Sequence, residues 1–380
     1  MTFATGSPPV ATLDPYDPAT VGDPFPLYDW LRTNDPVRHV AERDIWLVSR
    51  WDDVATAAAD ARRFSSAETN GRERRRLAVL VGADPPEHTR LRRQLAPAFT
   101  PRALEAWPEH ARMLAGEHVD RIVGGEHEIV GELAEPLACR FLADILGVPA
   151  RAIVELRHGR ALRPSPRVAL ARTFGELADR RRAEPGDDLV STLVTAGALT
   201  RAEIVNVCVL LLAAGADTTR DLAANLVLEL ASRPEQWALL RTRPGLAGSA
   251  VEEVLRFTSP IQAMFRTATD DVALSGTTVP GDARVMLLFG SANRDEARWA
   301  DAGTFDVARY ANGIAKHNHH MAFGAGPHAC LGAWLGRVVA TALLSELINR
   351  VSSLRTTGPV SRGRNPCFRS IASLPVETTG

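Results

Sequence analysis

The sequence predicts a mainly α-helical protein with small β-sheets, and two observations lead to that class. Apolar residues recur at helical spacing through three long segments: 87–147, 200–233 and 333–351. Strand-like composition is confined to short stretches within residues 37–48 and 272–288. Because no internal repeat or low-complexity linker separates these elements, we expect one domain over residues 1–380, with residues 1–26 as an irregular N-terminal arm.

The first part of the chain begins with strands and continues as helices. Two short apolar runs within residues 37–48, joined by a charged turn, predict a pair of strands. Residues 52–61 have helical spacing, as do residues 87–147. Proline and glycine interrupt helices, so we expect breaks at the Thr-Pro pair 100–101 and at the Gly-Gly pair 124–125.

A long helix follows near the middle of the chain. Thr200 and Glu203 have the spacing of a capping box, in which each residue satisfies a free backbone N–H group of the other. The helical pattern continues to about Arg233 and stops before Pro234. At ~1.5 Å per residue this helix is on the order of 50 Å long, which is enough to cross the whole molecule.

Shorter elements lie on both sides of this helix. The basic segment 149–185 is interrupted by Arg-Pro-Ser-Pro and predicts two helices with a turn between them. Residues 248–257 have helical spacing. Residues 272–288 predict a strand, a turn at the Pro-Gly-Asp sequence 280–282, and a second strand.

Composition excludes several classes of protein. With a net charge of −1, the chain has no overall field that attracts nucleic acid or anionic lipid. The four cysteines are far apart and do not suggest a disulfide framework. The N-terminus lacks the pattern of a secretory signal, and the longest apolar run, residues 207–216, is too short to span a bilayer. We therefore expect a soluble cytoplasmic protein.

The most informative feature is Cys330, which lies in the segment Phe-Gly-Ala-Gly-Pro-His-Ala-Cys-Leu-Gly, residues 323–332. The two glycines before the cysteine permit backbone angles closed to other residues, and Pro327 stiffens the turn. A helical pattern begins directly afterwards, so the helix N-terminus favours a thiolate at Cys330. A rigidly held thiolate suits an axial ligand of haem iron, where it favours O–O cleavage.

Two other interpretations of this cysteine remain open on the loop alone. A free cysteine is most often a buried small apolar residue. A zinc site is the second alternative, because four histidines lie close to Cys330 in the sequence: His317, His319, His320 and His328. Zinc sites usually rely on paired ligands at short fixed spacing, and no second cysteine is nearby.

With this loop the chain resembles the cytochrome P450 family, whose cysteine loop reads Phe-x-x-Gly-x-x-x-Cys-x-Gly. The matching residues are Phe323, Gly326, Cys330 and Gly332. The resemblance spans roughly residues 14–375 and implies a single-domain fold with a long central helix over a haem b group. It also implies that Phe323, Cys330 and Gly332 belong to the cofactor site, with the Cys330 thiolate on the iron.

The long helix carries a second match in the sequence Ala-Gly-Ala-Asp-Thr-Thr, residues 214–219. Gly215 weakens a helix and the Thr218 hydroxyl can bond back to a carbonyl one turn earlier, so we expect a local kink or bulge. In isolation this pattern suits an ordinary core helix. By resemblance to the family's oxygen-activation motif, Asp217 relays protons and Thr218 holds the iron-bound oxygen and its water.

A third match concerns three charged residues. Glu253 and Arg256 share a helix face at i and i+3, which taken alone is a weak surface pair. The segment Phe-Asp-Val-Ala-Arg, residues 305–309, supplies Arg309. The resemblance implies that the three side chains form a buried structural network supporting the cysteine loop.

Cations are also needed for the two haem propionates. His88 and Arg92 lie at i and i+4 on a predicted helix and resemble the family's His-x-x-x-Arg. Arg266 and His328 match the other propionate positions. Taken alone, each of these four residues could equally be an ordinary charged residue on the surface.

The substrate pocket is implied by resemblance only. Its predicted lining residues are small and apolar with one amide, which fits many compact organic molecules: Leu210, Ala213, Ala214, Gln262, Ala263 and Phe368. Two segments expected at its mouth are basic, and their arginines are Arg72, Arg74, Arg75, Arg76, Arg151, Arg157, Arg160, Arg163, Arg167 and Arg172. They suggest an anionic or carrier-protein-bound substrate, while solvated helix faces are the plainer interpretation.

The resemblance implies a monooxygenase that inserts one oxygen atom of O2 into a small organic substrate, by hydroxylation, epoxidation or O-dealkylation. Secondary metabolism or aromatic and xenobiotic catabolism in bacteria is the expected setting. The sequence has no flavin, nicotinamide or iron–sulfur motif, so electrons must come from another protein. The resemblance implies that they pass from NAD(P)H through ferredoxin and ferredoxin reductase, or flavodoxin. The alternatives are a peroxide-driven haem peroxygenase and a non-catalytic haem sensor or carrier, which has no use for Asp217 and Thr218.

Overall fold

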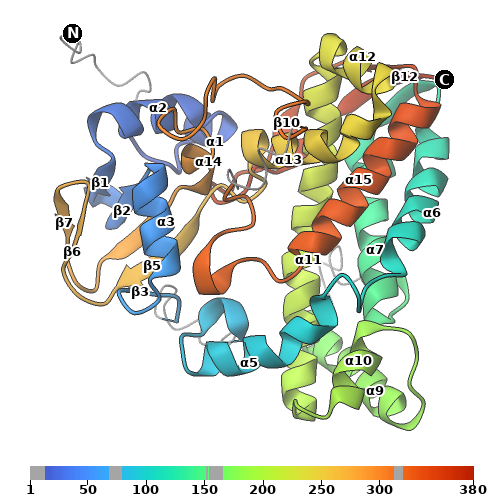
Figure 1. Ribbon diagram of the computed structural model, residues 1–380, viewed down its shortest axis with the longest axis horizontal. Coiled ribbons are helices and arrows are strands. Elements are labelled where there is room, and N and C mark those ends of the chain that lie inside the picture. The colour runs from blue at the N-terminus through green and yellow to red at the C-terminus, as the bar shows by residue number, and fades with distance from the viewer. Residues whose placement is uncertain (1–12, 68–78, 151–152, 154–165, 312–319) are drawn as a thin grey trace. The chain divides into compact units, whose positions relative to one another are not determined.

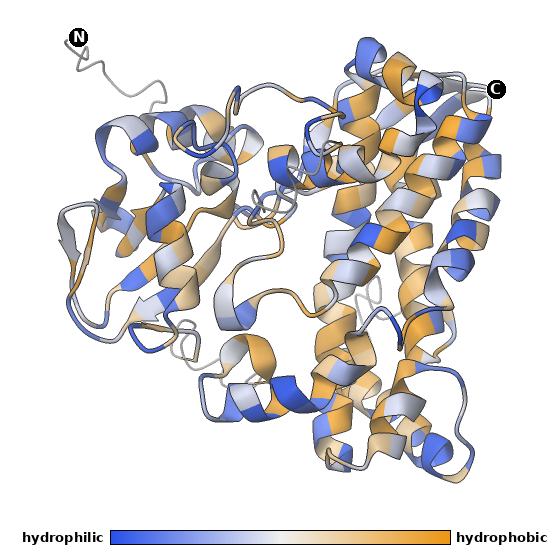
Figure 2. Cartoon of the chain, in the orientation of Figure 1, coloured by the Kyte–Doolittle hydropathy of each residue, from blue (hydrophilic) through white to orange (hydrophobic). Residues whose placement is uncertain are grey.

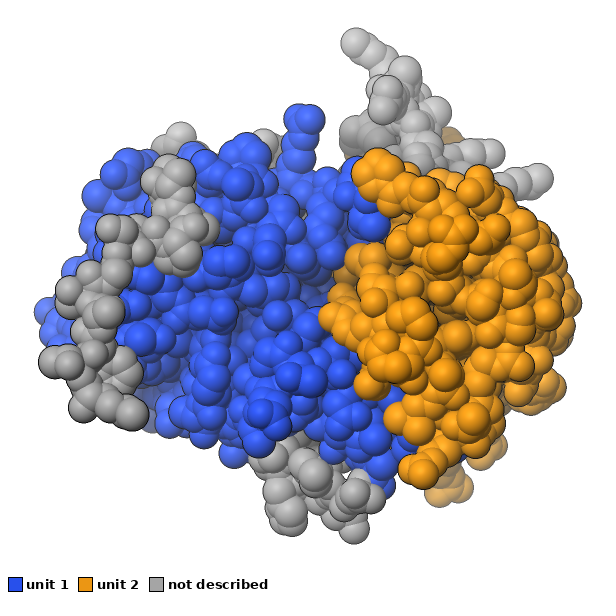
Figure 3. All heavy atoms as spheres, turned by 90° about the horizontal axis from the view of Figure 1, so that it is seen from above, with its two compact units in different colours: residues 1–85, 245–330, 360–372 blue, residues 86–244, 331–359, 373–380 orange. Residues whose placement is uncertain are grey.

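The computed structural model describes residues 13–67, 79–150, 153, 166–311 and 320–380. These residues are mostly helical and include four small sheets, which confirms the predicted class (Figure 1). The chain divides into two compact units, coloured separately in Figure 3, and each unit combines three separate segments of sequence. The expected single domain stays a prediction.

Unit 1 comprises residues 1–85, 245–330 and 360–372 and is built on a five-stranded sheet. The strand order is β1-β2-β8-β5-β3. The bounds are β1 Val37–Val40, β2 Ile45–Val48, β8 Arg284–Leu287, β5 Met264–Ala268 and β3 Phe64–Ser65. β2 pairs with β8 in parallel and every other neighbouring pair is antiparallel. The predicted strands within residues 37–48 are therefore confirmed, as an antiparallel pair.

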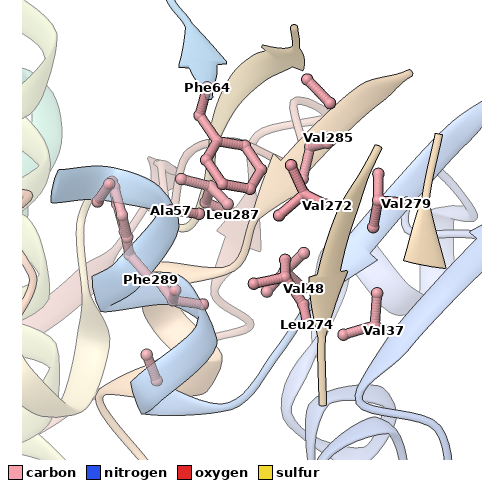
Figure 4. Packing of buried hydrophobic residues seen from close by; sticks show 14 of the residues in the cluster. Val37, Val48, Ala57, Phe64, Val272, Leu274, Val279, Val285, Leu287 and Phe289 are labelled. Atoms are coloured by element: carbon pink, nitrogen blue, oxygen red, sulfur yellow. The ribbon is translucent and has the colours of Figure 1, made fainter. Parts of the chain in front are cut away.

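One face of this sheet is covered by α3 (Trp51–Ala59), which buries Val54, Ala57 and Ala58. Figure 4 shows Phe64, Ala57 and Leu287 packed together in the resulting core. A second apolar cluster is formed with α2 (Phe25–Asn34), and its members include Leu27, Leu31, Leu47 and Met286. Alternate residues along β2 and β8 thus belong to different apolar clusters, and both faces of the sheet have apolar cover.

The described part of unit 1 contains three further α-helices: α1 (Pro18–Gly22), α13 (Ala247–Thr258) and α14 (Phe289–Ala292). The prediction of an irregular N-terminal arm was wrong at α1, because Asp17 caps this helix by accepting the Ala19 N–H at 2.9 Å. The segment predicted as strand-turn-strand has two turns. Ser275 and Gly276, both at positive φ, join β6 (Val272–Leu274) to β7 (Thr277–Val279), and the 280–282 turn then leads into β8.

Unit 2 comprises residues 86–244, 331–359 and 373–380 and is mainly a bundle of helices. Its described α-helices are α5 (Glu87–Leu95), α6 (Trp107–Val119), α7 (Glu135–Leu146), α9 (Pro166–Ala183), α10 (Leu189–Ala196), α11 (Arg201–Ala231), α12 (Pro234–Thr242) and α15 (Ala333–Arg350). The long helix α11 packs against α7, α9 and α15, and α15 also packs against α6. Figure 2 shows apolar residues recurring along these helices.

A three-stranded sheet at one end of unit 2 has the order β4-β12-β9. Its strands are β4 Gly125–Glu128, β12 Pro375–Thr379 and β9 Ser353–Thr356. The sequence predicts a break at the Gly-Gly pair 124–125 but not the strand that follows it. The partner of β4 lies some 250 residues further along the chain, in Thr378 and its neighbours, so local pattern could not reveal it.

Helix α11 begins as predicted. The Thr200 N–H donates to Glu203 Oε2 at 2.7 Å, and the Glu203 N–H donates to Thr200 Oγ1 at 3.3 Å, which completes the capping box. By length and composition alone α11 could cross a membrane. It buries the charged side chains of Asp221 and Glu229 among the neighbouring helices, as the core helix of a folded unit does.

Candidate functional site

The cysteine loop, defined here as residues 323–330, is held by its glycines and by one backbone hydrogen bond. Gly324 and Gly326 have φ values of +70° and +67°, so both predicted positions do adopt angles closed to other residues. A Cβ atom at Gly326 would lie 2.6 Å from Ala58 O, because the loop packs tightly against the end of α3. The Cys330 N–H closes the loop by donating to Phe323 O at 2.8 Å.

The surroundings of Cys330 are apolar and incompletely covered. The cysteine itself is exposed and Phe323, on the same loop, is only half-buried, as are Leu331 and Trp334 in the residues that follow in the sequence. Helix α15 starts at Ala333, so Cys330 lies three residues before it, outside the first turn in which a helix dipole acts strongly. An exposed thiol amid uncovered apolar side chains fits a large flat cofactor such as haem.

The zinc alternative finds no support in the residues described. Within them, no three His, Cys, Asp or Glu side chains are grouped so that they could hold a metal ion. His320 Nδ1 accepts the Ala322 N–H at 3.2 Å and Nε2 lies 3.1 Å from Glu252 Oε2. Residues 317 and 319 lie outside the described part of the chain.

Glu253, Arg256 and Arg309 come together in the interior of unit 1. Arg256 donates to both oxygens of Glu253, from Nε at 2.8 Å and from Nη2 at 2.7 Å, and neither side chain is exposed. Arg309 Nε donates to Glu253 Oε1 at 3.1 Å. The Asp306 N–H also donates to that oxygen at 3.0 Å. The pair is therefore a buried, fully bonded ionic network and not a surface bridge.

Arg256 extends this network to three backbone carbonyls in two other segments. Its Nη1 donates to Asn293 O at 3.0 Å and to Ala302 O at 2.9 Å, and its Nη2 donates to Thr304 O at 3.1 Å. A guanidinium has five N–H donors in a planar fork, so one side chain can hold a carboxylate and several carbonyls at once. The network thus ties α13 to the backbone after α14 and to the turn that contains Ala302 and Thr304.

The predicted acid–alcohol pair lies on α11 in unit 2. Thr218 Oγ1 donates to Ala214 O at 2.8 Å, which confirms the expected bond to the preceding turn. The helix is nevertheless assigned as continuous through Gly215, so the expected bulge is not seen. Gly215 has another reason to be small, because a Cβ atom there would lie 2.9 Å from Leu142 Cδ2 on α7.

Asp217 is half-exposed and has a partner that sequence reasoning missed. Arg220 Nη1 lies 3.1 Å from Asp217 Oδ1, and Arg220 Nη2 lies 2.8 Å from Oδ1 of the fully buried Asp221. Burial lowers the pKa of Arg220, but Asp221 and Asp217 more than offset it, so this pKa lies above its ordinary value. The i, i+3 spacing of Asp217 and Arg220 is visible in the sequence, but the second contact of Arg220, with the adjacent Asp221, is not a contact that helical spacing predicts.

The four predicted propionate ligands divide between the units. His88 and Arg92 lie on α5 in unit 2, and His88 is buried. Arg266 lies on β5 in unit 1, and His328 Nε2 lies 3.1 Å from Ser66 Oγ in the same unit. Each pair has the charge that a propionate needs.

Arg266 provides a test of whether unit 1 fits an anionic group. Its side chain is buried, and burial lowers the pKa of its guanidinium to about 10, although the charge of Asp84 acts in the opposite direction. Among the residues described, no carboxylate lies within ion-pair distance, and Nη1 donates to the adjacent Phe265 O at 2.7 Å. A buried cation without a paired carboxylate is costly, and a bound propionate would relieve that cost.

The predicted pocket residues separate into two groups. On α11, Ala213 and Ala214 are exposed and Leu210 is half-buried, so the middle of this apolar helix has uncovered surface. Phe368 is also half-buried and forms an isolated β-bridge with Ile261. Their predicted contact with substrate stays a prediction.

Gln262 and Ala263 belong to the second group, and the structure does not support their predicted contact with substrate. Gln262 is 1 % exposed, and its Nε2 donates to Thr258 O and Ser259 O, both at 2.7 Å. Ala263 has no exposed surface and packs in the apolar cluster beside α2. The amide of Gln262 is engaged by carbonyls left free at the C-terminus of α13, a demand that the sequence did not reveal.

Comparison with known proteins gives consistent matches. Residues 246–360 match the family described as Cytochrome P450. Nocardicin C N-oxygenase from Nocardia uniformis subsp. tsuyamanensis is 36 % identical over 393 residues, which cover 95 % of this chain and 96 % of that protein.

Solved structures show the same likeness over almost the whole chain. The crystal structure of CalO2 matches with a TM-score of 0.86 and 31 % identity, covering 97 % of this chain and 99 % of that one. P450BioI in complex with hexadec-9Z-enoic acid ligated acyl carrier protein matches with a TM-score of 0.84 and 30 % identity, covering 95 % and 99 %.

Proposed function

The chain belongs to the cytochrome P450 family, and from that premise we propose that Cys330 supplies the thiolate ligand of its haem iron. Members of this family are haem-thiolate monooxygenases, so the protein is a monooxygenase that uses O2. The observation that carries the assignment of Cys330 is its exposed thiol on a glycine-ordered loop, beside uncovered apolar side chains. When bound, the haem supplies the oxygen-activating chemistry, and the protein residues supply position, charge and protons.

Four cations are proposed for the propionates: His88, Arg92, Arg266 and His328. The support is strongest for Arg266, whose guanidinium is buried without a paired carboxylate among the described residues. Two charge-assisted bonds from cationic side chains would orient each propionate and hence the cofactor.

Asp217 and Thr218 are proposed as the groups that deliver protons during catalysis. Thr218 keeps its hydroxyl on the helix by donating to Ala214 O, so its lone pairs remain available to accept a hydrogen bond from a water molecule. Asp217 is half-exposed and can exchange protons with solvent. Arg220 holds the Asp217 carboxylate in place through a contact of 3.1 Å from Nη1 to Oδ1. This pair supports a monooxygenase over a haem sensor or carrier.

We expect Thr218→Ala to lower the amount of product formed per NAD(P)H consumed, because the hydroxyl that positions the proton-donating water is lost. Asp217→Asn should instead slow turnover, since the amide keeps the shape of the side chain but cannot carry a proton. The measurement is product, peroxide and NAD(P)H consumption in the reconstituted system. Thr219→Ala, one residue along the same helix, is the matched control. An unchanged ratio of product to NAD(P)H in Thr218→Ala, together with unchanged turnover in Asp217→Asn, would exclude these roles.

Electrons reach enzymes of this family from separate redox partners. Ferredoxin with ferredoxin reductase, or flavodoxin, is proposed here because the chain has no flavin, nicotinamide or iron–sulfur motif of its own. Such partners work in the cytoplasm of bacteria, and we place this protein there. The cysteines, scattered along the chain, agree with a reducing compartment.

The substrate is proposed to be a small organic molecule, either anionic or bound to an acidic carrier protein. Support comes from the basic sequence at the expected pocket mouth and from the acyl carrier protein in the P450BioI complex. Most of the arginines concerned, including Arg74 and Arg163, lie outside the described residues.

The dependence of substrate binding on ionic strength tests this substrate class. If the arginines attract an anion, the apparent dissociation constant of a carboxylate substrate should rise steeply with ionic strength, and should rise further in Arg74→Glu and Arg163→Glu. The measurement is spectral titration at several salt concentrations. Arg112→Glu, at an exposed position on α6, is the control. Binding that responds neither to salt nor to both reversals would leave these arginines as solvated surface residues.

A further inference from the structure

The root of the cysteine loop, defined as residues 320–322, is joined to the side chain of Asn293. Asn293 follows α14 and is completely buried. Its Oδ1 accepts the Met321 N–H at 2.6 Å, and its Nδ2 donates to Ser259 Oγ at 2.8 Å. Because a backbone N–H can only donate, the Met321 contact fixes which end of the amide is oxygen.

Asn293 also meets the ionic network through its backbone. Its carbonyl accepts from Arg256 Nη1 at 3.0 Å, and its N–H donates to Phe289 O at 2.9 Å. Ser259, the partner of Nδ2, has a φ of +46° directly after α13, and its hydroxyl donates to Arg256 O at 3.1 Å. The residue thus has contacts to α13, α14 and the loop root, all within unit 1.

We propose that Asn293 is a positioning residue that sets the place of the cysteine loop, and hence of the Cys330 thiolate. This inference rests on the proposed function of Cys330 as the haem ligand. The path from one residue to the other is short. Asn293 holds the Met321 N–H, Met321 O accepts the Gly324 N–H at 2.9 Å, and Phe323 O accepts the Cys330 N–H at 2.8 Å.

An amide is the group that this position needs. It must accept from Met321 and donate to Ser259 at the same time, and both contacts are buried. Aspartate keeps the acceptor but loses the donor and adds a buried charge, whereas alanine loses both contacts and leaves the Met321 N–H without its acceptor. The cysteine loop should therefore be held most firmly by asparagine at position 293, less firmly by aspartate and least firmly by alanine.

A second contact holds the same root from a different element. His320 Nε2 lies 3.1 Å from Glu252 Oε2 on α13. Since this contact does not involve Asn293, the root stays attached to α13 at one point when Asn293 is replaced. We therefore expect a loosened cysteine loop in the variants, and not a globally unfolded unit.

The test measures hydrogen exchange in the full-length, haem-loaded protein. In Asn293→Ala the peptide containing the Met321 amide should exchange roughly tenfold faster than in the natural protein, because one buried hydrogen bond is lost. The reduced, carbon-monoxide-bound protein should also convert faster from the red-shifted Soret band of thiolate ligation to an unshifted band. Asn293→Asp should show an exchange rate and a rate of spectral conversion between those of the natural protein and those of Asn293→Ala.

Ser49→Ala is the matched control, because it removes a hydrogen bond from a buried serine to Pro36 O in the same unit, and among the described residues neither Ser49 nor Pro36 is hydrogen-bonded to the loop root. If Asn293→Ala does not fold, the same measurements are made on Asn293→Asp and on Ser259→Ala, which removes the acceptor of Asn293 Nδ2. The inference is overturned if exchange at Met321 and the spectral conversion in these variants match those of Ser49→Ala. A natural protein without the red-shifted band, or one that keeps it in Cys330→His, would instead refute the proposed function of Cys330.

Discussion

Cys330→His should abolish the red-shifted Soret band that the natural protein shows when it is reduced under carbon monoxide. That band requires a thiolate on the iron, and an imidazole in the same loop cannot supply the electron density that a thiolate gives. Monooxygenase activity should be lost together with the band, while the fold survives because the Cys330 side chain is exposed and not part of the core. Optical spectra and the ratio of haem to protein are the measurements.

Cys208→Ala is the control for this substitution. Burial on α11 raises the pKa of the Cys208 thiol to about 12, so this cysteine carries no thiolate at neutral pH and its loss should leave the spectrum unchanged. Metal analysis that finds zinc and no haem in the natural protein would contradict the entire assignment.

Glu253→Ala should prevent stable loading of haem by destabilising unit 1. The substitution leaves Arg256 buried without its carboxylate and removes the partner of Arg309 Nε. Breaking a buried ion pair by removing one partner costs about 3–5 kcal/mol, a large share of the stability of a typical protein. Thermal unfolding should show a strongly lowered melting temperature, and purification should yield protein poor in haem.

A surface glutamate provides the comparison. Glu109 pairs with Arg112 at 2.6 Å on α6, but both side chains are more than half exposed, so Glu109→Ala should not change the melting temperature measurably. A haem-loaded Glu253→Ala protein that unfolds at the natural temperature would show that the network does not support the cysteine loop.

Much of the fold could be predicted because the decisive signals are local. The capping box at Thr200 and Glu203 needs only two residues three positions apart, and it marked the start of α11 correctly. Gly324 and Gly326 were predicted to take unusual backbone angles, since glycine is the residue that tolerates them. The same holds for the Thr218 hydroxyl, whose acceptor lies one turn away on its own helix.

The features that escaped prediction depend on partners distant in sequence. Gln262 looked like a polar pocket residue, and only the folded chain shows its amide engaged by the end of α13. The role of Asn293 could not be predicted from local sequence, because its partners Ser259 and Met321 are both about 30 residues away. Gly215 suggested a weak point in α11, whereas its small size is required by Leu142 on a neighbouring helix.

The interleaved order of the two units has a consequence for biosynthesis. Strands β1 and β2 leave the ribosome early, but β2 obtains its other neighbour only when β8 appears more than 230 residues later. Until then one edge of the β1–β2 pair has unpaired backbone groups, which invite aggregation. The Glu253 carboxylate likewise lacks one of its partners until Arg309 has been synthesised. Unit 1 therefore cannot complete its fold while only its N-terminal segment has been synthesised. A chain interrupted before residue 284 should remain dependent on chaperones.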